Sequence, residues 1–477
     1  MYHRPVNARA WLALLLCAGC RPDATTSPSD AAPLSEPNGS VRLILNRPSG
    51  DAPTDHCEAE HCRALLQLID GANETIDFAI YGMRNQTAIM DAIGRAQQRG
   101  VKIRGVVDRD HEGRNYYSST EQLVALVGEK NVHDDYKVDK SNTRVAEREG
   151  DRYEPKCNQP QGFEGPVQCL AYDLGDRCLM AAHASREPLG GGDAIMHNKF
   201  FVVDGRYVWT GSTNVSDSGT GGYNANLVTV LDSPKIATAY MREFEQMYSD
   251  GKYHRLKKSR GLLRVQVGDT EVEVMFSPQD TPIRERVRPL LKDAEKSIDV
   301  AVFFLTHKRI AEDLINAHLR GVKVRVIIDA TAATNGYTKH ELLRAAGIPV
   351  KIENWGGKMH AKSAVIDGHT VITGSMNWTS AGDDANDENV VILHSDELAA
   401  QYQTFFDDVW AMIDDKWLQG RPDPESKDSG SACTDGSDND FDELDDAADP
   451  GCGDDPPPLS DLPPQWIKPK DRATCEW

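Results

Sequence analysis

Residues 76–81 read IDFAIY, and residues 298–303 read IDVAVF. A second matched pair follows these stretches: residues 99–104, RGVKIR, and residues 320–325, RGVKVR. The members of the two pairs lie 222 and 221 residues apart, so the chain contains one structural unit twice. At 477 residues the chain also exceeds the usual size of a single hydrophobic core.

The same order of elements is predicted in both copies. The apolar run is followed by a helical segment, residues 87–98 or 310–319, and then by a second apolar run that ends at Asp108 or Asp329. Strand, helix and strand in this order form a β-α-β unit. We therefore predict an α/β fold built from two repeats.

The two copies diverge after these strands. His197 lies 89 positions beyond Asp108, whereas His360 lies only 31 positions beyond Asp329. The first copy therefore carries an insertion of 58 residues within residues 113–192, a polar and glycine-rich stretch with three cysteines. We predict a disulfide-pinned surface loop there, serving either as decoration or as a substrate lid.

A third matched block carries the polar residues. Residues 196–204, MHNKFFVVD, and residues 359–367, MHAKSAVID, each lead to a G-S-x-N run at residues 211–214 or 374–377. Both copies fit the pattern H-x-K-x4-D-x6-G-S-x-N. A single H-x-K occurs by chance in many strands, but the full spacing occurring twice indicates a site.

The strand period explains the geometry of this motif. Residues two apart in a strand point to the same face, so His197 and Lys199 project together, as do His360 and Lys362. Burial of these groups on otherwise apolar strands is costly unless they line a cleft or pair. Two such strands facing each other across a pseudo-two-fold axis predict one shared anion site.

A phosphodiester suits this inventory of side chains. Its cleavage needs a nucleophile and a proton donor, which histidines supply, and positive charge around the phosphoryl oxygens, which lysines supply. We expect no cofactor for catalysis, because no carboxylate–histidine cluster at metal spacing lies near the motifs. Neutral hydrogen bonds to the phosphoryl oxygens are expected from Ser212, Asn214, Ser375 and Asn377.

The paired motif resembles the two HKD motifs of the phospholipase D superfamily, and the resemblance covers roughly residues 41–417. It implies two α/β repeats with mixed sheets flanked by helices, and a phosphohistidine intermediate resolved by water or an alcohol. It further implies His197 as nucleophile and His360 as general acid, although the near symmetry of the copies leaves their order open. The catalytic residues implied are His197, Lys199, Asp204, His360, Lys362, Asp367 and Glu388, with the aspartates mainly structural.

Glu388 makes the two copies unequal. The equal spacing from Asn214 to Asn226 and from Asn377 to Asn389 aligns Glu388 with Ala225. In related enzymes an acidic residue here hydrogen-bonds a catalytic histidine and fixes its tautomer. Asp217 or an inserted residue is the candidate substitute in the first copy.

The ends of the chain differ from the repeats in composition. Residues 1–20 combine basic residues with a short apolar run, as a secretory signal does, and their end resembles a bacterial lipobox with Cys20 as the lipidated residue. We predict a signal at residues 1–20, a linker at 21–40, repeat 1 at 41–255, repeat 2 at 256–417 and an acidic tail at 418–477. The chain is thus expected to be exported, either secreted or membrane-anchored.

Eight further cysteines, an even number, fit an oxidising compartment. Five precede the tail and three lie within it, so complete pairing would join tail to core by at least one bridge. They are Cys57, Cys62, Cys157, Cys169, Cys178, Cys433, Cys452 and Cys475.

The tail contributes −11 to the formal net charge of −21. Between Cys433 and Cys452 carboxylates recur at alternate positions, as in a calcium loop, and the pattern resembles thrombospondin type 3-like repeats. Glu443 stands where an EF-hand has glycine, so the alternative is a solvated acidic linker. The candidate ligands of a structural calcium ion are Asp438, Asp440, Asp442 and Asp449.

Two enzymatic functions and one non-enzymatic function compete. Export and acidity favour a phospholipase D that acts on phospholipid headgroups at a membrane surface, as a monomer. Residues 359–362, 374–379 and 386–389 resemble small endonucleases and mitochondrial cardiolipin hydrolases of the same superfamily, so nucleic acid is the alternative partner. A net charge of −21 lacks the basic surface that nonspecific nucleic-acid binding draws on. A scaffold with a degenerate site is disfavoured by the intact motifs.

Overall fold

The computed structural model describes residues 33–138, 167–172, 178–182, 194–459 and 466–467. Side chains are described for residues 33–138 and 194–459. The predicted secretory signal and Cys20 lie outside the described residues. Within the described part of the chain, no helix is both long and apolar enough to cross a membrane.

The first repeat builds a seven-stranded sheet in the order β2-β12-β10-β9-β3-β5-β6. Strand β3 pairs in parallel with β5 and antiparallel with β9, so the sheet is mixed as predicted. The strands are β2 (Ser40–Asn46), β3 (Thr75–Ile80), β5 (Lys102–Val107), β6 (Val132–Asp134), β9 (Lys199–Val203), β10 (Tyr207–Gly211) and β12 (Asn226–Asp232).

The second repeat builds a nine-stranded sheet in the order β1-β13-β14-β20-β19-β18-β15-β16-β17. The run from β20 to β17 repeats the run from β12 to β6 in order and direction, so the predicted duplication holds strand by strand. The strands are β1 (Leu34–Glu36), β13 (Leu263–Val267), β14 (Thr270–Ser277), β15 (Ser297–Val302), β16 (Lys323–Ile328), β17 (Val350–Ile352), β18 (Lys362–Ile366), β19 (Thr370–Gly374) and β20 (Glu388–His394).

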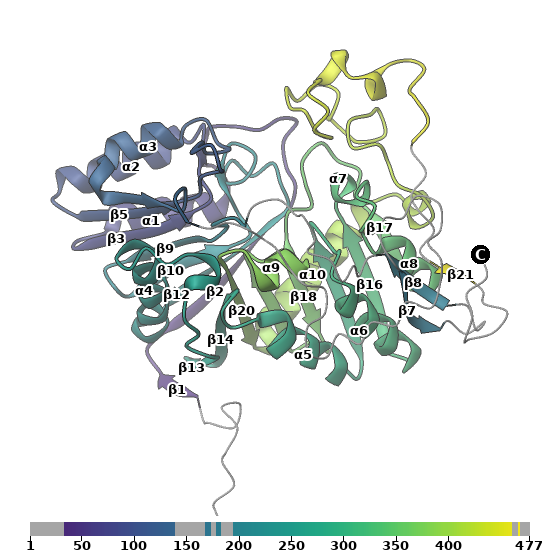
Figure 1. Cartoon of the computed structure of the whole chain (residues 1–477), viewed down its shortest axis with the longest axis horizontal. Helices are drawn as coiled ribbons and strands as arrows, with labels where there is room; N and C mark the ends of the chain where they lie inside the picture. The colour runs from purple at the N-terminus through teal and green to yellow at the C-terminus, as the bar shows by residue number, and fades with distance from the viewer. Residues whose placement is uncertain (1–32, 139–166, 173–177, 183–193, 460–465, 468–477) are drawn as a thin grey trace, which may run out of the picture. The chain divides into compact units, whose positions relative to one another are not determined.

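Helices cover both faces of each sheet (Figure 1). In α2 (Thr87–Gln98) the buried residues Ile89, Ala92, Ile93 and Ala96 follow the helical period and form the apolar face that packs on the first sheet. Helices α1 (Glu60–Gly71) and α3 (Thr120–Val127) pack on this same face. Helices α5 (Arg288–Asp293), α6 (Lys308–Leu319) and α8 (His340–Ala345) cover the corresponding face of the second sheet.

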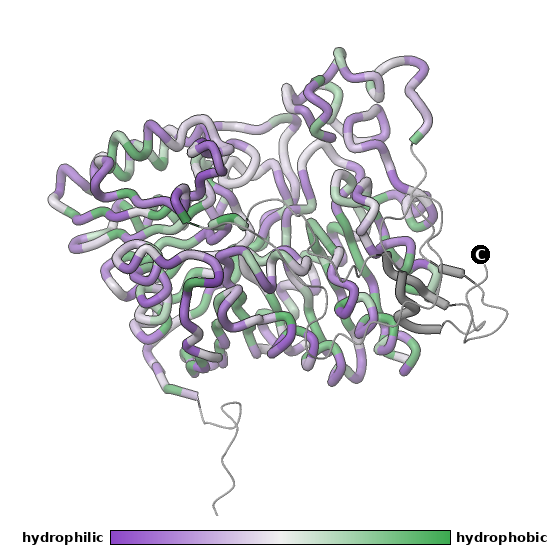
Figure 2. Tube along the Cα trace, viewed as in Figure 1, coloured by the Kyte–Doolittle hydropathy of each residue, from purple (hydrophilic) through white to green (hydrophobic). Residues whose placement is uncertain are grey.

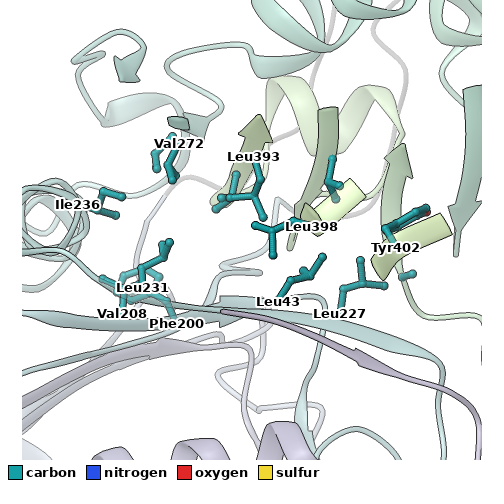
Figure 3. Packing of buried hydrophobic residues seen from close by; sticks show 14 of the residues in the cluster. Leu43, Phe200, Val208, Leu227, Leu231, Ile236, Val272, Leu393, Leu398 and Tyr402 are labelled. Atoms are coloured by element: carbon teal, nitrogen blue, oxygen red, sulfur yellow. The ribbon is translucent and has the colours of Figure 1, made fainter. Parts of the chain in front are cut away.

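One apolar core joins the two repeats. It holds residues of both sheets together with α4 (Pro234–Tyr248) and α10 (Asp396–Met412). Phe200 and Leu227 of the first sheet face Leu393 and Leu398 of the second repeat across this core (Figure 3). Figure 2 shows hydrophobic residues concentrated on the central strands and hydrophilic ones along the outer turns. Each motif strand therefore has apolar packing on both of its faces.

Two segments differ from the sequence-based expectation. Residues 34–36, within the predicted linker, form β1 and pair in parallel with β13. Residues 120–134, within the predicted insertion, form α3 and β6, which match α8 and β17 of the second repeat. Their buried Leu123, Val127 and Val132 belong to the repeat's own core, so the insertion begins later than residue 113. Polar flanks on both sides obscured these short apolar elements.

The tail docks on the repeats through buried residues, among them Ala432 and Asn439. Cys433 and Cys452 lie at disulfide distance from each other, as do Cys57 and Cys62. Both pairs are local. The other cysteines lie outside the residues whose side chains the structure describes, so they neither support nor contradict a bridge from tail to core.

Candidate active site

The two H-x-K segments are each held by the opposite repeat. The amide of His197 donates to the carbonyl oxygen of Asp387 at 3.0 Å, and the amide of His360 donates to that of Ala225 at 2.9 Å. Each segment thus forms a short bridge to the start of the other repeat's last strand, β20 or β12. These reciprocal backbone bridges bring both motifs together, so the two repeats form one shared site.

The imidazoles are also oriented from across the repeat boundary. His197 Nδ1 lies 2.8 and 2.9 Å from the two carboxylate oxygens of Glu388, and His360 Nδ1 lies 3.1 Å from Asn226 Oδ1. Both contacts place the Nδ1 proton against an oxygen and leave Nε2 for chemistry. The two histidines therefore share an orientation but differ in the charge of their partner.

The alignment of Glu388 with Ala225 is wrong by one residue. The Ser212 amide donates to the carbonyl of Leu227, whereas the Ser375 amide donates to that of Asn389. The first copy therefore has one more residue in this connection, and Asn226, not Ala225, matches Glu388. Asp217 does not replace the acid, because its carboxylate pairs with Arg84 at 2.7 Å.

The lysines lie beneath the histidines and are almost fully buried. Lys199 Nζ donates to the carbonyl of His197 at 2.7 Å, and Lys362 Nζ to that of His360 at 2.6 Å. Burial lowers the pKa of Lys199 to about 7, and burial together with the charge of Lys199 holds the pKa of Lys362 well below its usual range. A bound anion would therefore favour the charged forms of both lysines.

The same forces act on the other titratable groups of the site. Burial and the two lysine charges hold the pKa values of His197 and His360 well below the usual 6.5. Burial raises the pKa of Glu388 to about 8 despite the nearby lysines. Burial thus disfavours the charged forms of both His197 and Glu388.

Matched aromatic rings flank the histidines. Tyr81 and Phe303, which end the stretches IDFAIY and IDVAVF, lie 5.5 and 5.2 Å from the rings of His197 and His360. Lys199 Nζ lies 5.8 Å from the Tyr81 ring, and Lys362 Nζ lies 5.0 Å from the Phe303 ring. The rings stabilise the lysine charges and keep water from one side of the site.

The predicted phosphate-binding serines occupy a different position. Ser212 Oγ donates to Asn226 Oδ1 at 2.8 Å, and Ser375 Oγ accepts from the amide of Asn389 at 3.0 Å. Both serines are fully buried, so they brace the residues that orient the histidines. Asn214 does line the cleft, with its Nδ2 donating to Tyr117 Oη at 2.9 Å. Asn377 is not among the described residues that line it.

The motif aspartates lie at the far ends of the motif strands. Asp204 accepts hydrogen bonds from the backbone amides of residues 73–75, and Asp367 accepts from those of residues 295–297. Both have positive φ, +51° and +55°, which asparagine and aspartate tolerate better than most residues. Both carboxylates thus fix the entry into β3 or β15 and contact no cleft-lining residue described here.

We predict that Asp204→Ala lowers the free energy of unfolding by roughly 2 kcal/mol, because three backbone amides, one half-buried and two exposed, lose their acceptor. Activity per folded molecule should fall less than tenfold. Backbone amides lower the pKa of Asp204 below 3.8, so its contribution is present at neutral pH and is lost as pH falls below that value. Chemical denaturation of Asp204→Ala against the exposed-site control Asp91→Ala measures this; equal stabilities would contradict the assignment.

Asp108 and Asp329 form a second aspartate pair, which the sequence indicates only as the ends of two strands. Asp108 Oδ1 accepts from the amide of Met196 at 2.8 Å, and Asp329 Oδ2 accepts from that of Met359 at 3.0 Å. Each fixes the residue before a motif histidine. Their equal place in the repeat, directly after β5 or β16, was the signal available in the sequence.

His360 opens onto a cleft of about 660 Å³, which Tyr81, beside His197, also lines. Residues of the first repeat, the second repeat and the tail all line it; among them His360, Asn214 and the candidate calcium ligand Asp438 were predicted as site residues, and Asp217 as a candidate substitute for Glu388. Those not predicted include Tyr81, Arg84, Tyr117, Tyr223, Lys358, Asp435 and Phe441.

The candidate calcium ligands lie in the docked tail. Carboxylate oxygens of Glu425, Asp438 and Asp440 lie within 4.8 Å of one another, as do those of Asp440, Asp442 and Asp449. Glu425, which lies outside the predicted loop, joins the four predicted residues. These donors are all oxygens, which is the ligand type calcium prefers.

Two sheets with one H-x-K motif each, joined at a shared anion site, define the class of phospholipase D-like proteins. Within it, the chain belongs to the family described as cardiolipin synthase, PLD-like domain, whose model matches residues 65–248 and 287–410, more than half of the chain.

Relatives and solved structures agree with this family. The chain is 37% identical over 123 residues to a mitochondrial cardiolipin hydrolase of Chlamydomonas reinhardtii, which covers 26% of this chain and 55% of the relative. It is 41% identical over 109 residues to a phospholipase D of Rickettsia felis, covering 23% and 54%. The chain thus spans about half the length of these relatives. Phosphatidylserine synthase of Haemophilus influenzae Rd KW20, 12% identical, covers 78% of this chain and 89% of its own with a TM-score of 0.51, which shows a shared fold.

Proposed function

We propose that the protein is a phosphodiesterase of the phospholipase D type that hydrolyses the headgroup phosphodiester of phospholipids. The observation that carries the proposal is the cross-repeat pairing of His197 with Glu388 and of His360 with Asn226, which leaves both Nε2 atoms for chemistry. The buried lysines beneath them supply the positive charge that a phosphodiester needs.

The unequal partners assign the roles of the histidines. In the first step His197 Nε2 attacks phosphorus, the bond to the headgroup oxygen breaks, and His360 gives its Nε2 proton to the leaving alkoxide. The carboxylate of Glu388 supports the positive charge that grows on His197. The neutral amide of Asn226 gives no such support, so a protonated His360 is the stronger acid.

The second step reverses the proton transfer. The now neutral His360 takes a proton from water, the water oxygen attacks phosphorus, and the phosphorus–nitrogen bond to His197 breaks. The products are a phosphatidic acid and the free headgroup alcohol. An alcohol in place of water gives transfer of the phosphatidyl group by the same path.

A substrate panel tests the activity. The mature protein in EDTA is incubated with vesicles of choline or ethanolamine phospholipids, with cardiolipin vesicles, and with single- and double-stranded DNA. We expect phosphatidic acid and free headgroup from the first vesicles. Cleavage of DNA alone would replace this function with a nuclease, and cleavage of cardiolipin alone would narrow it to a cardiolipin hydrolase. Loss of turnover in EDTA while the tail stays folded would contradict metal-free catalysis.

Export is part of the proposal. Two cysteine pairs at disulfide distance, together with the predicted signal at residues 1–20, support an oxidising compartment. Anchoring through Cys20 would place the cleft near a membrane, where its substrate lies. Metabolic labelling with a fatty acid, with Cys20→Ala as the comparison, tests the anchor.

We also propose that the tail binds one or more structural calcium ions. Burial and neighbouring carboxylates raise the pKa of Glu425 to about 7 and that of Asp440 to about 6, so the cluster holds like charges that a divalent cation would neutralise.

We predict that calcium raises the thermal unfolding midpoint of the full chain and releases or absorbs heat in calorimetry, because an ion that binds only the folded state stabilises it. Asp440→Asn should abolish both effects, since Asp440 belongs to both carboxylate sets. The exposed Asp455→Asn is the control. If the wild type showed no heat of binding and no shift of the unfolding midpoint, calcium binding would be excluded.

A further inference from the structure

The tail segment of residues 431–441 packs against both repeats beside the active site. Tyr223 of the first repeat donates from Oη to Asp435 Oδ2 at 2.5 Å and lies 2.9 Å from Ser431 Oγ. Asn439 Nδ2 donates to the carbonyl of Gly356, in the second repeat, at 2.9 Å. The segment therefore sits across the boundary between the repeats, where the two histidines also meet.

A lysine of the second repeat connects this segment to the motif. Lys358 lies two residues before His360, and its Nζ donates to the carbonyl oxygen of Asn439 and, at 2.6 Å, to Thr331 Oγ1. The same ammonium lies 5.1 Å from the centre of the Phe441 ring. The position of the segment is thus tied to the backbone that carries His360.

The packing at this contact leaves no spare room. A Cβ atom added at Gly356 would come within 2.0 Å of Tyr223 Oη, 2.7 Å of Ser431 Oγ and 3.0 Å of the Ala432 amide nitrogen. Asp435 and Asn439 are only 6% and 2% exposed. The segment is accordingly a fixed part of the folded protein.

The side of the segment that faces the cleft has a definite chemistry. Residues 435–439 and Phe441 line the cleft together with Arg84, Tyr116 and Tyr117. Phe441 and Tyr116 are 57% and 62% exposed. The segment therefore adds an exposed aromatic ring to the residues that line the cleft.

We propose that residues 431–441 form a substrate-selecting wall, which admits a phospholipid headgroup and excludes a polynucleotide strand. This inference rests on the proposed function. A cleft of about 660 Å³ has the size of small-molecule sites, whereas a single strand needs a groove that tracks its backbone over several nucleotides. The exposed rings of Phe441 and Tyr116 contact the apolar part of a lipid.

The test measures the ratio of kcat/KM for a choline phospholipid to that for a single-stranded oligonucleotide. Gly356→Ala pushes the wall away and should lower this ratio by about tenfold or more. Gly336→Ala is the matched control, because its added Cβ meets no atom within 4 Å. If Gly356→Ala does not fold, Phe441→Ala replaces it, with the similarly exposed Leu256→Ala as its control. Phe441→Ala should lower the ratio because it weakens turnover of the lipid.

The outcomes separate the two proposals. In one outcome the wild type is active, while the Gly356→Ala and Phe441→Ala variants have the same kcat/KM ratios as their controls. That result would overturn the selecting wall and leave the proposed function intact. A wild type inactive on every phosphodiester would refute the proposed function itself, and the selecting wall with it.

Discussion

His197→Asn abolishes turnover of a choline phospholipid, and His360→Asn lowers it by on the order of 10⁴ or more, because nucleophile and proton donor act as one unit. The two variants then differ with a phosphatidyl p-nitrophenyl ester. Its leaving group departs as an anion and needs no proton. His360→Asn should therefore release a burst of nitrophenolate, close to one per chain, and then stall, since no base activates water.

The stalled variant should carry the phosphatidyl group on His197 Nε2, which mass spectrometry of alkaline-quenched protein detects. His197→Asn should give neither burst nor adduct. His369→Asn, at an exposed histidine that pairs with Asp396, is the control and should behave as the wild type. A burst from His197→Asn but not from His360→Asn would reverse the roles and would contradict the argument from Glu388 and Asn226.

The sequence predicted what depends on local periodicity and duplication. The H-x-K pairs point to one side because alternate strand residues do, and IDFAIY and IDVAVF supply β3 and β15, which have matching places in the two sheets. It did not predict which groups hold the imidazoles. Glu388 and His197 are 191 residues apart, and a one-residue difference between the copies displaced the alignment by one position.

The tail was least predictable for a physical reason. It has no counterpart in the repeat, and its acidic composition resembles that of a solvated linker. Its place at the cleft depends on a few specific contacts, such as Tyr223 with Asp435 and Asn439 with Gly356. Neither periodicity nor charge signals such contacts, so the residues that shape substrate access were mostly missed.

Lys199→Met and Lys362→Met should separate activity from stability. Each should lower kcat/KM by about 10²–10³, because a charge aimed at the phosphoryl oxygens is lost. Each should nevertheless raise the unfolding midpoint at pH 6–7, because the folded protein disfavours these buried charges. The lost hydrogen bond to the histidine carbonyl offsets the gain by only about 1 kcal/mol.

The stability gain of Lys199→Met should depend on pH. The pKa of Lys199 falls from 10.5 to about 7 on folding, so its penalty is full below pH 7 and is relieved as pH rises toward 10.5. The stability advantage of Lys199→Met should therefore shrink over this range. The equally buried Lys257 is the opposite control: its pKa is raised by contact with Asp387 and Glu243, and Lys257→Met should destabilise by about 3–5 kcal/mol. If Lys199→Met and Lys362→Met were destabilised like Lys257→Met, the site's lysines would be structural ion-pair partners and not charges held ready for a phosphodiester.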